Sequence, residues 1–223
     1  MTLKARDIIV KPISSVDAAR IVKLYHYSGK VVPTSQLHFG VFLDGKCGGA
    51  MSFGPSMVKE NMLGIVEGTK WNGFLELNRM AFADWLPKNS ESRAIGVALR
   101  IIKKNYPHVD WVISFSDGTQ CGDGTIYRAS GFVLTQIKKN CGILKLPNGQ
   151  IETLLSLNLK GAKTGQSAGW WKKNGATPLK GFQLRYIYFL NKEARARLTC
   201  PEIPFSEIKA QGAGMYLGKL KSE

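Results

Sequence analysis

The chain has 223 residues, 44% of them hydrophobic, and this length suits one globular domain or one domain with an extension. Its 31 Lys and Arg residues against 16 Asp and Glu residues give a net charge of +15, which predicts a polyanionic partner, most often nucleic acid. A membrane surface and a merely well-solvated basic protein are the alternative explanations of this charge. The chain shows no signal peptide and no apolar run of about 18 residues, so we expect a cytoplasmic protein without a transmembrane segment.

The cysteines are Cys47, Cys121, Cys141 and Cys200. They have no Cys-x-x-Cys spacing and no cluster of histidines beside them, which argues against a structural zinc site. We expect reduced thiols that mostly fill the core.

The first elements along the chain are a strand and a helix. Residues 7–13 predict the strand, and Ser14 and Asp17 have the spacing of a capping box that opens the helix. The helix ends before Gly29, because glycine is common at helix stops. Its periodicity places three residues on one face: Ile21, Leu24 and Tyr25.

A hairpin and another strand follow. Residues 37–43 and 47–53 predict the two strands of the hairpin, joined by the turn dipeptide Asp44-Gly45. Residues 56–72 predict a glycine-containing loop with weak periodicity, and residues 74–82 predict the next strand.

The centre of the chain predicts an amphipathic helix followed by a buried strand. A polar connection at 84–92 leads into the helix, which we expect over residues 93–104. Residues 111–115 are apolar throughout and predict a short strand buried on both faces, and residues 124–130 predict a short helix. The apolar stripe of the first helix is expected to consist of Ile95, Leu99 and Ile102.

The last third of the chain has a different composition. Strands are predicted near 132–137, 142–146, 151–158 and 185–190, and the segment beyond residue 160 is rich in Gly, Lys and Ser. Residues 138–223 hold 15 basic and 5 acidic groups, against 16 and 11 in residues 1–137. No long Pro/Ser linker is present, so we expect a single domain over 1–223 with a basic C-terminal extension from about residue 160.

A short glycine motif marks a candidate phosphate-binding turn. The first turn of a helix has unpaired N–H groups and the positive end of the helix dipole, and Gly96 and Ala98 would let a pyrophosphate approach the backbone closely. Arg93 precedes them, and Ser90 or Ser92 would cap the helix or face the ligand. The alternative is an ordinary helix with a tolerated glycine.

Two polar residues follow the buried strand. Asp117 stands at its carboxyl end, where open sheets favour ligands, although Asp-Gly is also a common turn. Tyr127 lies on the short helix, and its neutral phenol would be a suitable general acid, with half-buried packing as the alternative.

The order of strand, polar loop, glycine-containing helix, buried strand and tyrosine resembles the acyl-CoA core of the GCN5-related N-acetyltransferases. The resemblance implies a mixed α+β fold, with a central, mostly antiparallel sheet flanked by helices. It also implies that Arg93, Gly96 and Ala98 bind an acyl-CoA-like donor, and that Tyr127 protonates a leaving thiolate.

Several longer segments resemble one family more specifically, the Mom DNA-modification proteins of Mu-like bacteriophages. That family places a carbamoylmethyl group on the exocyclic amine of adenine in phage DNA, and the product resists host restriction enzymes. The resemblance implies the same activity here, in the cytoplasm of a host cell. The segments that carry it are 26–28, 77–80, 87–93, 116–118, 126–132 and 185–190.

The resemblance also implies a catalytic set. Arg79, Ser92 and Tyr127 match the positions associated with activity in the family, and three further polar residues match positions that would line the same cleft. Those three are His26, Tyr27 and Asp117.

His26, Tyr27 and Asp117 are N and O ligand types compatible with iron. They are not a tight sequence motif, and the more common role of a lone histidine is a hydrogen-bonded structural one. Arg79 would bind an acidic part of the donor or a DNA phosphate, or would form an ion pair at the end of a strand.

A DNA-binding surface is expected in the basic C-terminal part of the chain. Lys and Arg side chains bind phosphates, and an aromatic pair can stack on a base extruded from the duplex. Packing in a core or an interface is the alternative for the aromatic pair. The expected DNA-binding residues are Trp170, Trp171, Lys172, Lys173 and Arg185.

The chemistry leaves several possibilities open. An adenine amine inside a base pair is hard to reach, so we expect a flipped base in double-stranded DNA. The family's product carries a methylene carbon on nitrogen, which simple acetyl transfer cannot make, so the donor is unusual, a rearrangement follows, or a metal and radical chemistry take part. The alternatives to this activity are a conventional acetyl-CoA-dependent N-acetyltransferase acting on a protein or small-molecule amine, and a noncatalytic DNA-binding protein.

Overall fold

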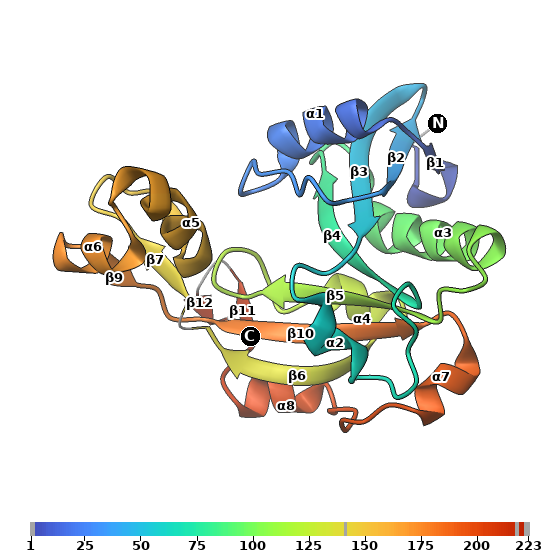
Figure 1. The fold of residues 1–223 in the computed structure, drawn as a ribbon. Helices are drawn as coiled ribbons and strands as arrows, with labels where there is room; N and C mark the ends of the chain where they lie inside the picture. Colours follow the sequence, from blue (N-terminus) through green and yellow to red (C-terminus); the bar gives the residue numbers. More distant parts are fainter. Residues whose placement is uncertain (1–2, 141, 217–218, 221–223) are drawn as a thin grey trace. The chain divides into compact units, whose positions relative to one another are not determined.

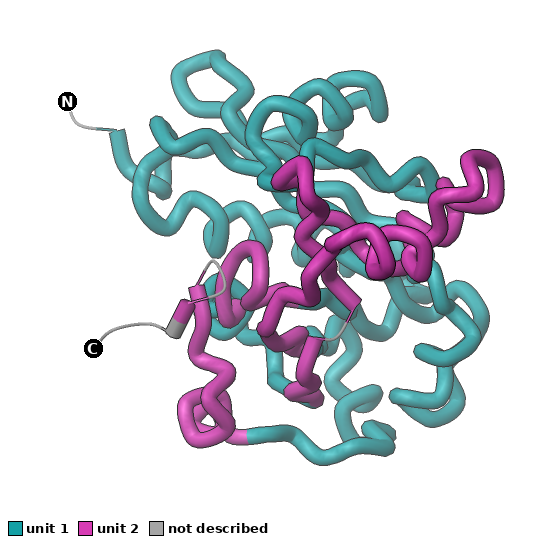
Figure 2. Tube along the Cα trace, turned by 90° about the vertical axis from the view of Figure 1, so that its left-hand side faces the viewer, with its two compact units in different colours: residues 1–115, 125–135, 185–203 teal, residues 116–124, 136–184, 204–223 magenta. Residues whose placement is uncertain are grey.

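The computed structural model describes residues 3–140, 142–216 and 219–220, and these divide into two compact units (Figure 2). The first unit comprises residues 1–115, 125–135 and 185–203. The second comprises residues 116–124, 136–184 and 204–223, so its longest segment begins before residue 160. Within the described ranges, no helix has both the length and the apolar character needed to cross a membrane.

A seven-stranded sheet forms the main framework (Figure 1). Strands β1 to β4 follow one another as antiparallel neighbours, β4 pairs with β5 in parallel, and the order is β1-β2-β3-β4-β5-β10-β6. The chain passes between the two units within β5, β6 and β10. The strands are β1 (Ile9–Pro12), β2 (Leu37–Leu43), β3 (Lys46–Gly54), β4 (Phe74–Phe82), β5 (Trp111–Asp117), β6 (Val133–Lys139) and β10 (Phe182–Phe189).

The expected fold class is confirmed. The sheet is mostly antiparallel and helices flank it, and β4, helix α3 (Ser90–Asn105), β5 and helix α4 (Thr125–Ala129) follow one another in the expected order. The hairpin of β2 and β3 is also confirmed. Its turn residues Asp44 and Gly45 have φ angles of 49° and 74°, the left-handed conformation that a tight hairpin turn requires.

Helix α1 (Ser15–Tyr25) begins at the predicted cap, where Ser14 Oγ accepts a hydrogen bond from the Asp17 N–H at 3.1 Å. The predicted apolar face was partly wrong. Ile21 is buried, but Leu24 is 65% exposed and Tyr25 is 40% exposed, because Ala18 and Val22 complete the face that packs on β3 and β4.

Helix α3 starts three residues earlier than expected and buries the predicted stripe of Ile95, Leu99 and Ile102. The segment 56–72, predicted to be a loop, contains the short helix α2 (Lys59–Leu63). A separate 3-10 turn, η1 (Ala5–Asp7), lies near the N-terminus, before β1. Met62 and Leu63 of α2 pack against a core cluster that includes Phe74 and Trp111, so tertiary burial stabilises a helix too short to form alone.

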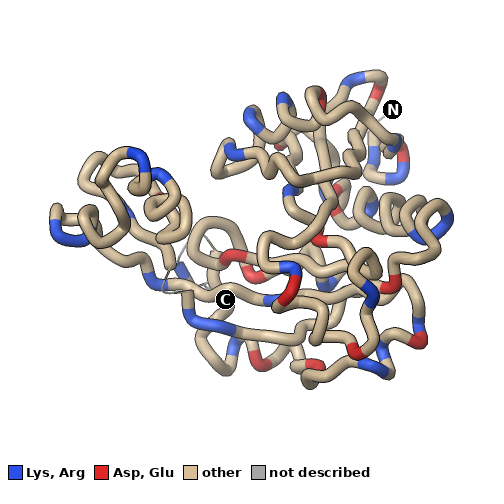
Figure 3. The backbone as a smooth tube through the Cα atoms, viewed as in Figure 1, with Lys and Arg blue, Asp and Glu red and all other residues tan. Residues whose placement is uncertain are grey.

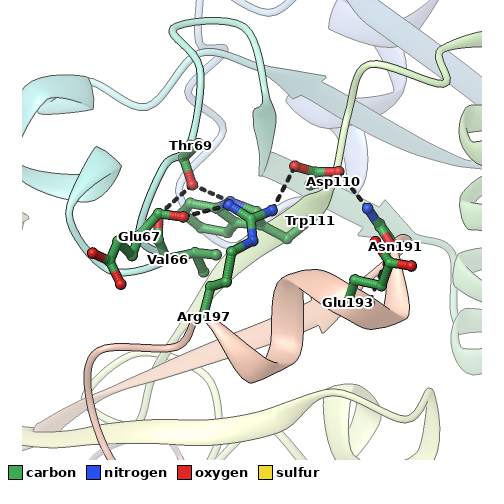
Figure 4. Close-up of polar contacts among 8 residues, drawn as sticks. All are labelled: Val66, Glu67, Thr69, Asp110, Trp111, Asn191, Glu193 and Arg197. Atoms are coloured by element: carbon green, nitrogen blue, oxygen red, sulfur yellow. Dashed lines mark hydrogen bonds and ion pairs between the residues drawn. The ribbon is translucent and has the colours of Figure 1, made fainter.

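The returning segment of the first unit is tied to the start of β5 by a polar network (Figure 4). Arg197 Nη2 lies 3.0 Å from Asp110 Oδ2, and Nη1 donates to the Glu67 carbonyl. Asn191, just before helix α7 (Lys192–Ala196), donates from Nδ2 to the other Asp110 oxygen at 3.0 Å and accepts the Glu193 N–H. This network joins three segments that are far apart in the sequence.

The second unit contains a small three-stranded sheet and short helices. The predicted strand at 151–158 is wrong beyond residue 153, because Thr153 Oγ1 accepts the Ser156 N–H and caps a helix instead. Gly161 of this helix lies so close to the next one that a Cβ atom would come within 2.5 Å of the Ser167 backbone. The elements are β7 (Ile143–Lys145), β8 (Ile151–Thr153), α5 (Leu154–Thr164), α6 (Ala168–Lys173), β9 (Thr177–Pro178), α8 (Ser206–Ala210), β11 (Met215–Tyr216) and β12 (Lys219–Leu220).

The cysteines behave partly as expected. Cys47, Cys121 and Cys200 are free thiols in partly buried positions, and Cys47 packs against the cluster beneath α1. Burial is the main cause that raises the pKa of the Cys121 thiol. Cys141 lies outside the described residues.

Candidate active site

A β-bulge in β4 organises the candidate site in the first unit. Ser52 of β3 pairs with Arg79 while Phe53 pairs with Leu77, so Asn78 is an extra residue in β4. A bulge bends its strand and redirects the neighbouring side chains. Asn78 is nearly buried, and its side chain accepts a hydrogen bond from Ser35 Oγ at 3.0 Å and donates to the Pro55 carbonyl at 3.4 Å.

The bulge coincides with the point where β4 and β5 cease to pair. The last parallel pair is Glu76 with Ile113, although both strands continue. Immediately beyond it, Ser114 Oγ donates to the Leu77 carbonyl at 3.4 Å, so a side chain replaces the next rung of the ladder. Beyond this point backbone groups along β4 are no longer paired with β5, and a ligand with amide groups could use them.

Arg79 is held in place by the main chain. Its Nε donates to the Lys30 carbonyl at 2.8 Å and its Nη1 donates to the Asn78 carbonyl at 2.7 Å. These bonds use two of the five guanidinium N–H groups and join the bulge to the segment after α1. The predicted catalytic arginine therefore has a fixed position.

His26 lies beside Arg79 and is neutral at physiological pH. Burial and the positive charge of Arg79 lower the pKa of His26 to about 4. Its Nδ1 accepts the Ser28 N–H at 3.1 Å and lies 2.8 Å from Ser28 Oγ, so the proton of the neutral ring is on Nε2. Tyr27, 54% exposed, packs its ring 4.3 Å from the imidazole.

Glu76 is a site residue that the sequence reasoning missed. Burial raises the pKa of its carboxyl group, against the opposing effects of hydrogen bonds from Ser56 and Asn78 and of the Arg79 charge. A signal was present, because Glu76, Asn78 and Arg79 are three polar residues within an otherwise apolar strand. Buried carboxyl groups with raised pKa values are typical of functional sites.

A cavity of about 330 Å³ lies at the start of α3. Its lining includes Ser92, whose Oγ donates to the Asn89 carbonyl at 3.2 Å, and Lys88. Asn89, at the cap position, has a φ angle of 71° and makes no side-chain capping bond. The lining also holds the carboxylates of Asp84 and Glu91, so an anionic group such as a phosphate would have to lie on the side of Lys88 and of the unbonded N–H groups at the start of α3.

The predicted phosphate-binding motif lies elsewhere in this helix. Because α3 begins at Ser90, Gly96 and Ala98 are in its second and third turns, where their N–H groups bond within the helix, and Ala98 is fully buried. Arg93 donates its N–H to the Asn89 carbonyl, and its side chain is exposed. The Ser90 N–H donates to the Pro87 carbonyl at 3.1 Å, so the donors left for an anion are those of residues 89, 91 and 92. Neither Ser90 nor Ser92 caps the helix as expected.

Tyr127 lies on α4 and is 9% exposed. Its ring lies 5.4 Å from the ring of Phe132 and 5.3 Å from that of Tyr186. Its α4 neighbours Thr125, Ile126 and Ala129 line the cavity at the start of α3 together with Ser92. The structure thus brings Ser92 and the helix that carries Tyr127 to one cavity, and brings His26 and Arg79 together at the bulge.

Asp117 has a local structural role in the second unit. Its Oδ1 accepts the Thr119 N–H at 2.9 Å and a bond from Asn140 Nδ2 at 3.3 Å, and its Oδ2 accepts from Gln120 Nε2 at 3.2 Å. These bonds form a turn of the kind expected for Asp-Gly. Both carboxylate oxygens are therefore engaged with the loop that follows β5.

The proposed iron ligands find no support in this structure. No group of three or more His, Cys, Asp and Glu side chains that could hold a metal lies within residues 3–140, 142–216 and 219–220. A metal on His26 Nε2 would place the remaining proton on Nδ1, which accepts the Ser28 N–H here. His26 and Tyr27 belong to the first unit and Asp117 to the second, so the iron set stays a prediction.

The predicted DNA-binding residues have different environments. Trp170 is 38% exposed, whereas Trp171 packs against the core cluster of the second unit, and the two rings lie edge to face at 4.9 Å. Lys172 and Lys173 are exposed in the last turn of α6. Residues 142–181 carry six lysines and one carboxylate, and Figure 3 shows basic positions along α5 and α6.

Arg185, in the first unit, is engaged within the protein. Its Nε donates to Thr135 Oγ1 at 2.9 Å, and its Nη2 contacts the Thr135 carbonyl at 3.4 Å and Cys200 Sγ at 3.2 Å. These contacts join β10 to β6 and to the segment around residue 200. This role differs from the expected contact with DNA.

Comparison with known proteins gives a family and a relative. A model of the Mom protein family matches residues 7–207, a range that contains every predicted site residue. The methylcarbamoylase Mom of Escherichia phage Mu is 36% identical over 198 residues, which cover 87% of this chain and 80% of that protein.

Two solved acetyltransferases also match. The ribosomal-protein-S18-alanine N-acetyltransferase of Escherichia coli matches with a TM-score of 0.47 and 10% identity, over 82% of this chain and 94% of that one. The IAA acetyltransferase of Bacillus cereus matches with a TM-score of 0.46 and 10% identity, over 82% and 99% of the two chains.

Proposed function

This chain belongs to the Mom protein family, and we propose that it adds a carbamoylmethyl group to the exocyclic amine of adenine in phage DNA, which protects that DNA from host restriction enzymes in the host cytoplasm. The family match over residues 7–207 carries this proposal, because it includes the bulge, the cavity and Tyr127 of α4. The relative from phage Mu is a methylcarbamoylase by name, and this supports a group-transfer reaction. The net charge of +15 supports DNA as the substrate.

We assign the acceptor amine to the region of the bulge. A flipped adenine would place its amine near Glu76, whose carboxyl group can accept a hydrogen bond from it. The amine is a poor nucleophile because its lone pair is delocalised into the ring, so close positioning is the main contribution of the enzyme. Neutral His26 would offer its Nε2–H as a donor, and the fixed charge of Arg79 would bind an acidic group of the donor or of the DNA.

We assign the group donor to the cavity at the start of α3. The anionic part of an acyl-CoA-like donor fits the residues present there, namely Lys88, Ser92 and the first turn of α3. Such a donor, when bound, supplies an activated carbon for transfer. Tyr127, on the helix beside the cavity, would protonate the leaving group.

A conventional N-acetyltransferase would use the same cavity, and the product distinguishes the two activities. Acetyl transfer forms an amide, with a carbonyl carbon on nitrogen, whereas the carbamoylmethyl product has a methylene carbon there. The proposal therefore requires an unusual donor, a rearrangement after transfer, or a metal and radical chemistry.

Nucleoside mass spectrometry tests the proposal directly. DNA from cells that express the protein should contain an adenosine with the mass of a carbamoylmethyl adduct, and the Tyr127→Phe variant should lack it. An acetylated acceptor and unmodified DNA would favour the acetyltransferase. Unmodified DNA together with salt-sensitive DNA binding that Tyr127→Phe leaves unchanged would favour a noncatalytic DNA-binding protein.

A further inference from the structure

A second cavity of the first unit, of about 390 Å³, lies between α2 and the turn that precedes β4. It is lined by residues 56–61 and Trp71, and we call it the Trp71 pocket. The residues of the bulge, of the α3 cavity and of the polar network around Asp110 are not part of its lining. Its volume is within the range of roughly 300–1,000 Å³ that is typical of small-ligand sites.

The pocket gathers exposed apolar side chains. Met57 is 67% exposed, Val58 is 51% exposed and Trp71 is 55% exposed, and all three line the same cavity. Single exposed apolar residues are common on protein surfaces, but several that converge on one concave site indicate binding. Lys59 Nζ covers one face of the Trp71 indole, so an aromatic ring could stack only on the other face.

One wall of the pocket is anchored to the core, and the other is a hydrogen-bonded turn. On one side, Met62 and Leu63 of α2 pack into the cluster around Phe74. On the other side, Trp71 lies in a turn closed by a 2.7 Å bond from the Gly73 N–H to the Lys70 carbonyl, directly before β4. The pocket therefore exists without a ligand, which lowers the entropic cost of binding.

The lining of the pocket holds one cation, one amide and the carboxylate of Glu60, and the cation and the amide match parts of a nucleotide. Lys59 Nζ lies 4.5 Å from the centre of the Trp71 ring and donates to Asn72 Oδ1 at 3.1 Å, so one cation fixes the orientation of the ring and lies within reach of a phosphate. Asn61 supplies an amide, and an Asn amide can pair with both the exocyclic amine and a ring nitrogen of adenine.

The pocket is connected to the bulge. Ser56, a buried residue of its lining, hydrogen-bonds the Glu76 carboxyl group, and the adjacent Pro55 carbonyl accepts a bond from Asn78. Ser56 thus links the lining of the pocket to Glu76, which is not itself part of the lining. The sequence predicts only a loop over residues 56–72 and no site residue within it.

We propose that the Trp71 pocket receives the adenine base flipped out of DNA, with Trp71 stacking on the base, Asn61 reading its amine edge and Lys59 contacting a phosphate. The inference rests on the proposed function for the identity of the base, and it adds the binding site. It predicts that base binding and group transfer depend on separate side chains.

Binding is tested by nuclear magnetic resonance on the full chain, with dAMP as the probe and dCMP for comparison. The five Trp indole N–H signals report separately, and the Trp71 signal is identified by its absence from Trp71→Phe. We expect dAMP to shift the Trp71 signal more than the other four, and we expect dCMP to shift it less. Asn61→Asp, which loses the amide donor, should remove the preference for dAMP. A Trp71 signal that does not respond, or that responds equally to both nucleotides, would overturn the proposal.

Activity gives the second readout. Trp71→Ala should lower the yield of modified adenine by roughly 5- to 150-fold, the loss that corresponds to one base stack. The control Tyr216→Ala removes an aromatic residue of similar exposure, 57%, and should leave the yield unchanged. Full yield from Trp71→Ala and Asn61→Asp would refute the pocket and leave the proposed function intact. A dAMP-dependent Trp71 shift in a protein that modifies no DNA would support the pocket and refute the proposed function.

Discussion

The Ser28 backbone N–H donates to His26 Nδ1 at 3.1 Å, and this bond determines which nitrogen of the neutral imidazole carries the proton. The N–H can donate only to a nitrogen without hydrogen, so the proton is on Nε2. The ring therefore presents its Nε2–H as a donor in this structure. Its chemistry follows from a residue two positions away, and that relationship leads to the first prediction.

His26 should stay neutral well below the pKa of an ordinary histidine. Its pKa is lowered to about 4, so between about pH 6.5 and 4 the unfolded chain binds a proton that the folded chain does not. The contribution of His26 to the free energy of unfolding therefore decreases as the pH falls through that window, by at most about 1.4 kcal/mol per pH unit. Urea denaturation at pH 7 and pH 5, compared with His26→Gln, isolates the contribution of the ring. Equal pH dependence in both proteins would contradict it.

Arg79→Ala should abolish modification of DNA and leave the protein folded. Because the Arg79 charge lowers the pKa values of both His26 and Glu76, its removal should raise both, and an imidazole titration by magnetic resonance checks this for His26. Arg100→Ala is the control, since Arg100 is exposed on α3. An unchanged His26 titration would show that the two side chains do not interact in solution.

Tyr127→Phe and Ser92→Ala should each sharply reduce modification with little effect on stability. Phenylalanine keeps the ring contacts with Phe132 and Tyr186, so we expect a change in unfolding free energy below about 1 kcal/mol. Tyr188→Phe removes a hydroxyl from the same aromatic cluster and should retain activity. Full activity in both site variants would refute the catalytic assignment.

Arg197→Ala should destabilise the first unit by about 1–3 kcal/mol, because it leaves Asp110 and the Glu67 carbonyl without a charged donor. The Arg195–Glu202 ion pair has shorter contacts, 2.6 Å, but the Arg195 side chain is 57% exposed. Arg195→Ala should therefore cost less than about 1 kcal/mol. Urea denaturation of both variants tests this order, and a larger loss in Arg195→Ala would contradict it.

Replacement of Lys172 and Lys173 by Gln should weaken DNA binding. It should also reduce the steepness of the plot of log binding constant against log salt concentration by about 2. Lys103 and Lys104 form a matched control, because they are also exposed neighbours in the last turn of a helix. Electrophoretic or fluorescence titrations over a range of salt concentrations measure both slopes. The same slope for both double variants would remove α6 from the DNA-binding surface.

Replacement of the neighbouring residues Trp170 and Trp171 by Ala should affect different properties of the protein. Trp171→Ala should lower stability by a few kcal/mol, since the ring packs against Leu144, Leu157 and their neighbours. Trp170→Ala should leave stability nearly unchanged and reduce DNA binding. Thermal unfolding and DNA titration of both variants separate packing from recognition.

The sequence by itself determined most of the elements of the first unit. The strands at 37–43 and 74–82, the hairpin turn at Asp44-Gly45 and the cap at Ser14 were predicted correctly, because alternation, turn residues and capping act between close neighbours. The family resemblance predicted Arg79 and Ser92 as site residues, and the charge pattern predicted a polyanionic partner.

Tertiary structure decided what local patterns do not encode. The start of α3 depends on the left-handed backbone of Asn89, and the strand pattern at 151–158 gave way to a helix that buries Leu157 and Gly161. The bulge at Asn78 exists because β3 and β4 pair in a particular register. Register, burial and side-chain partners join residues that are distant in the chain, so Glu76, the tautomer of His26 and the Trp71 pocket emerge only when those segments pack together.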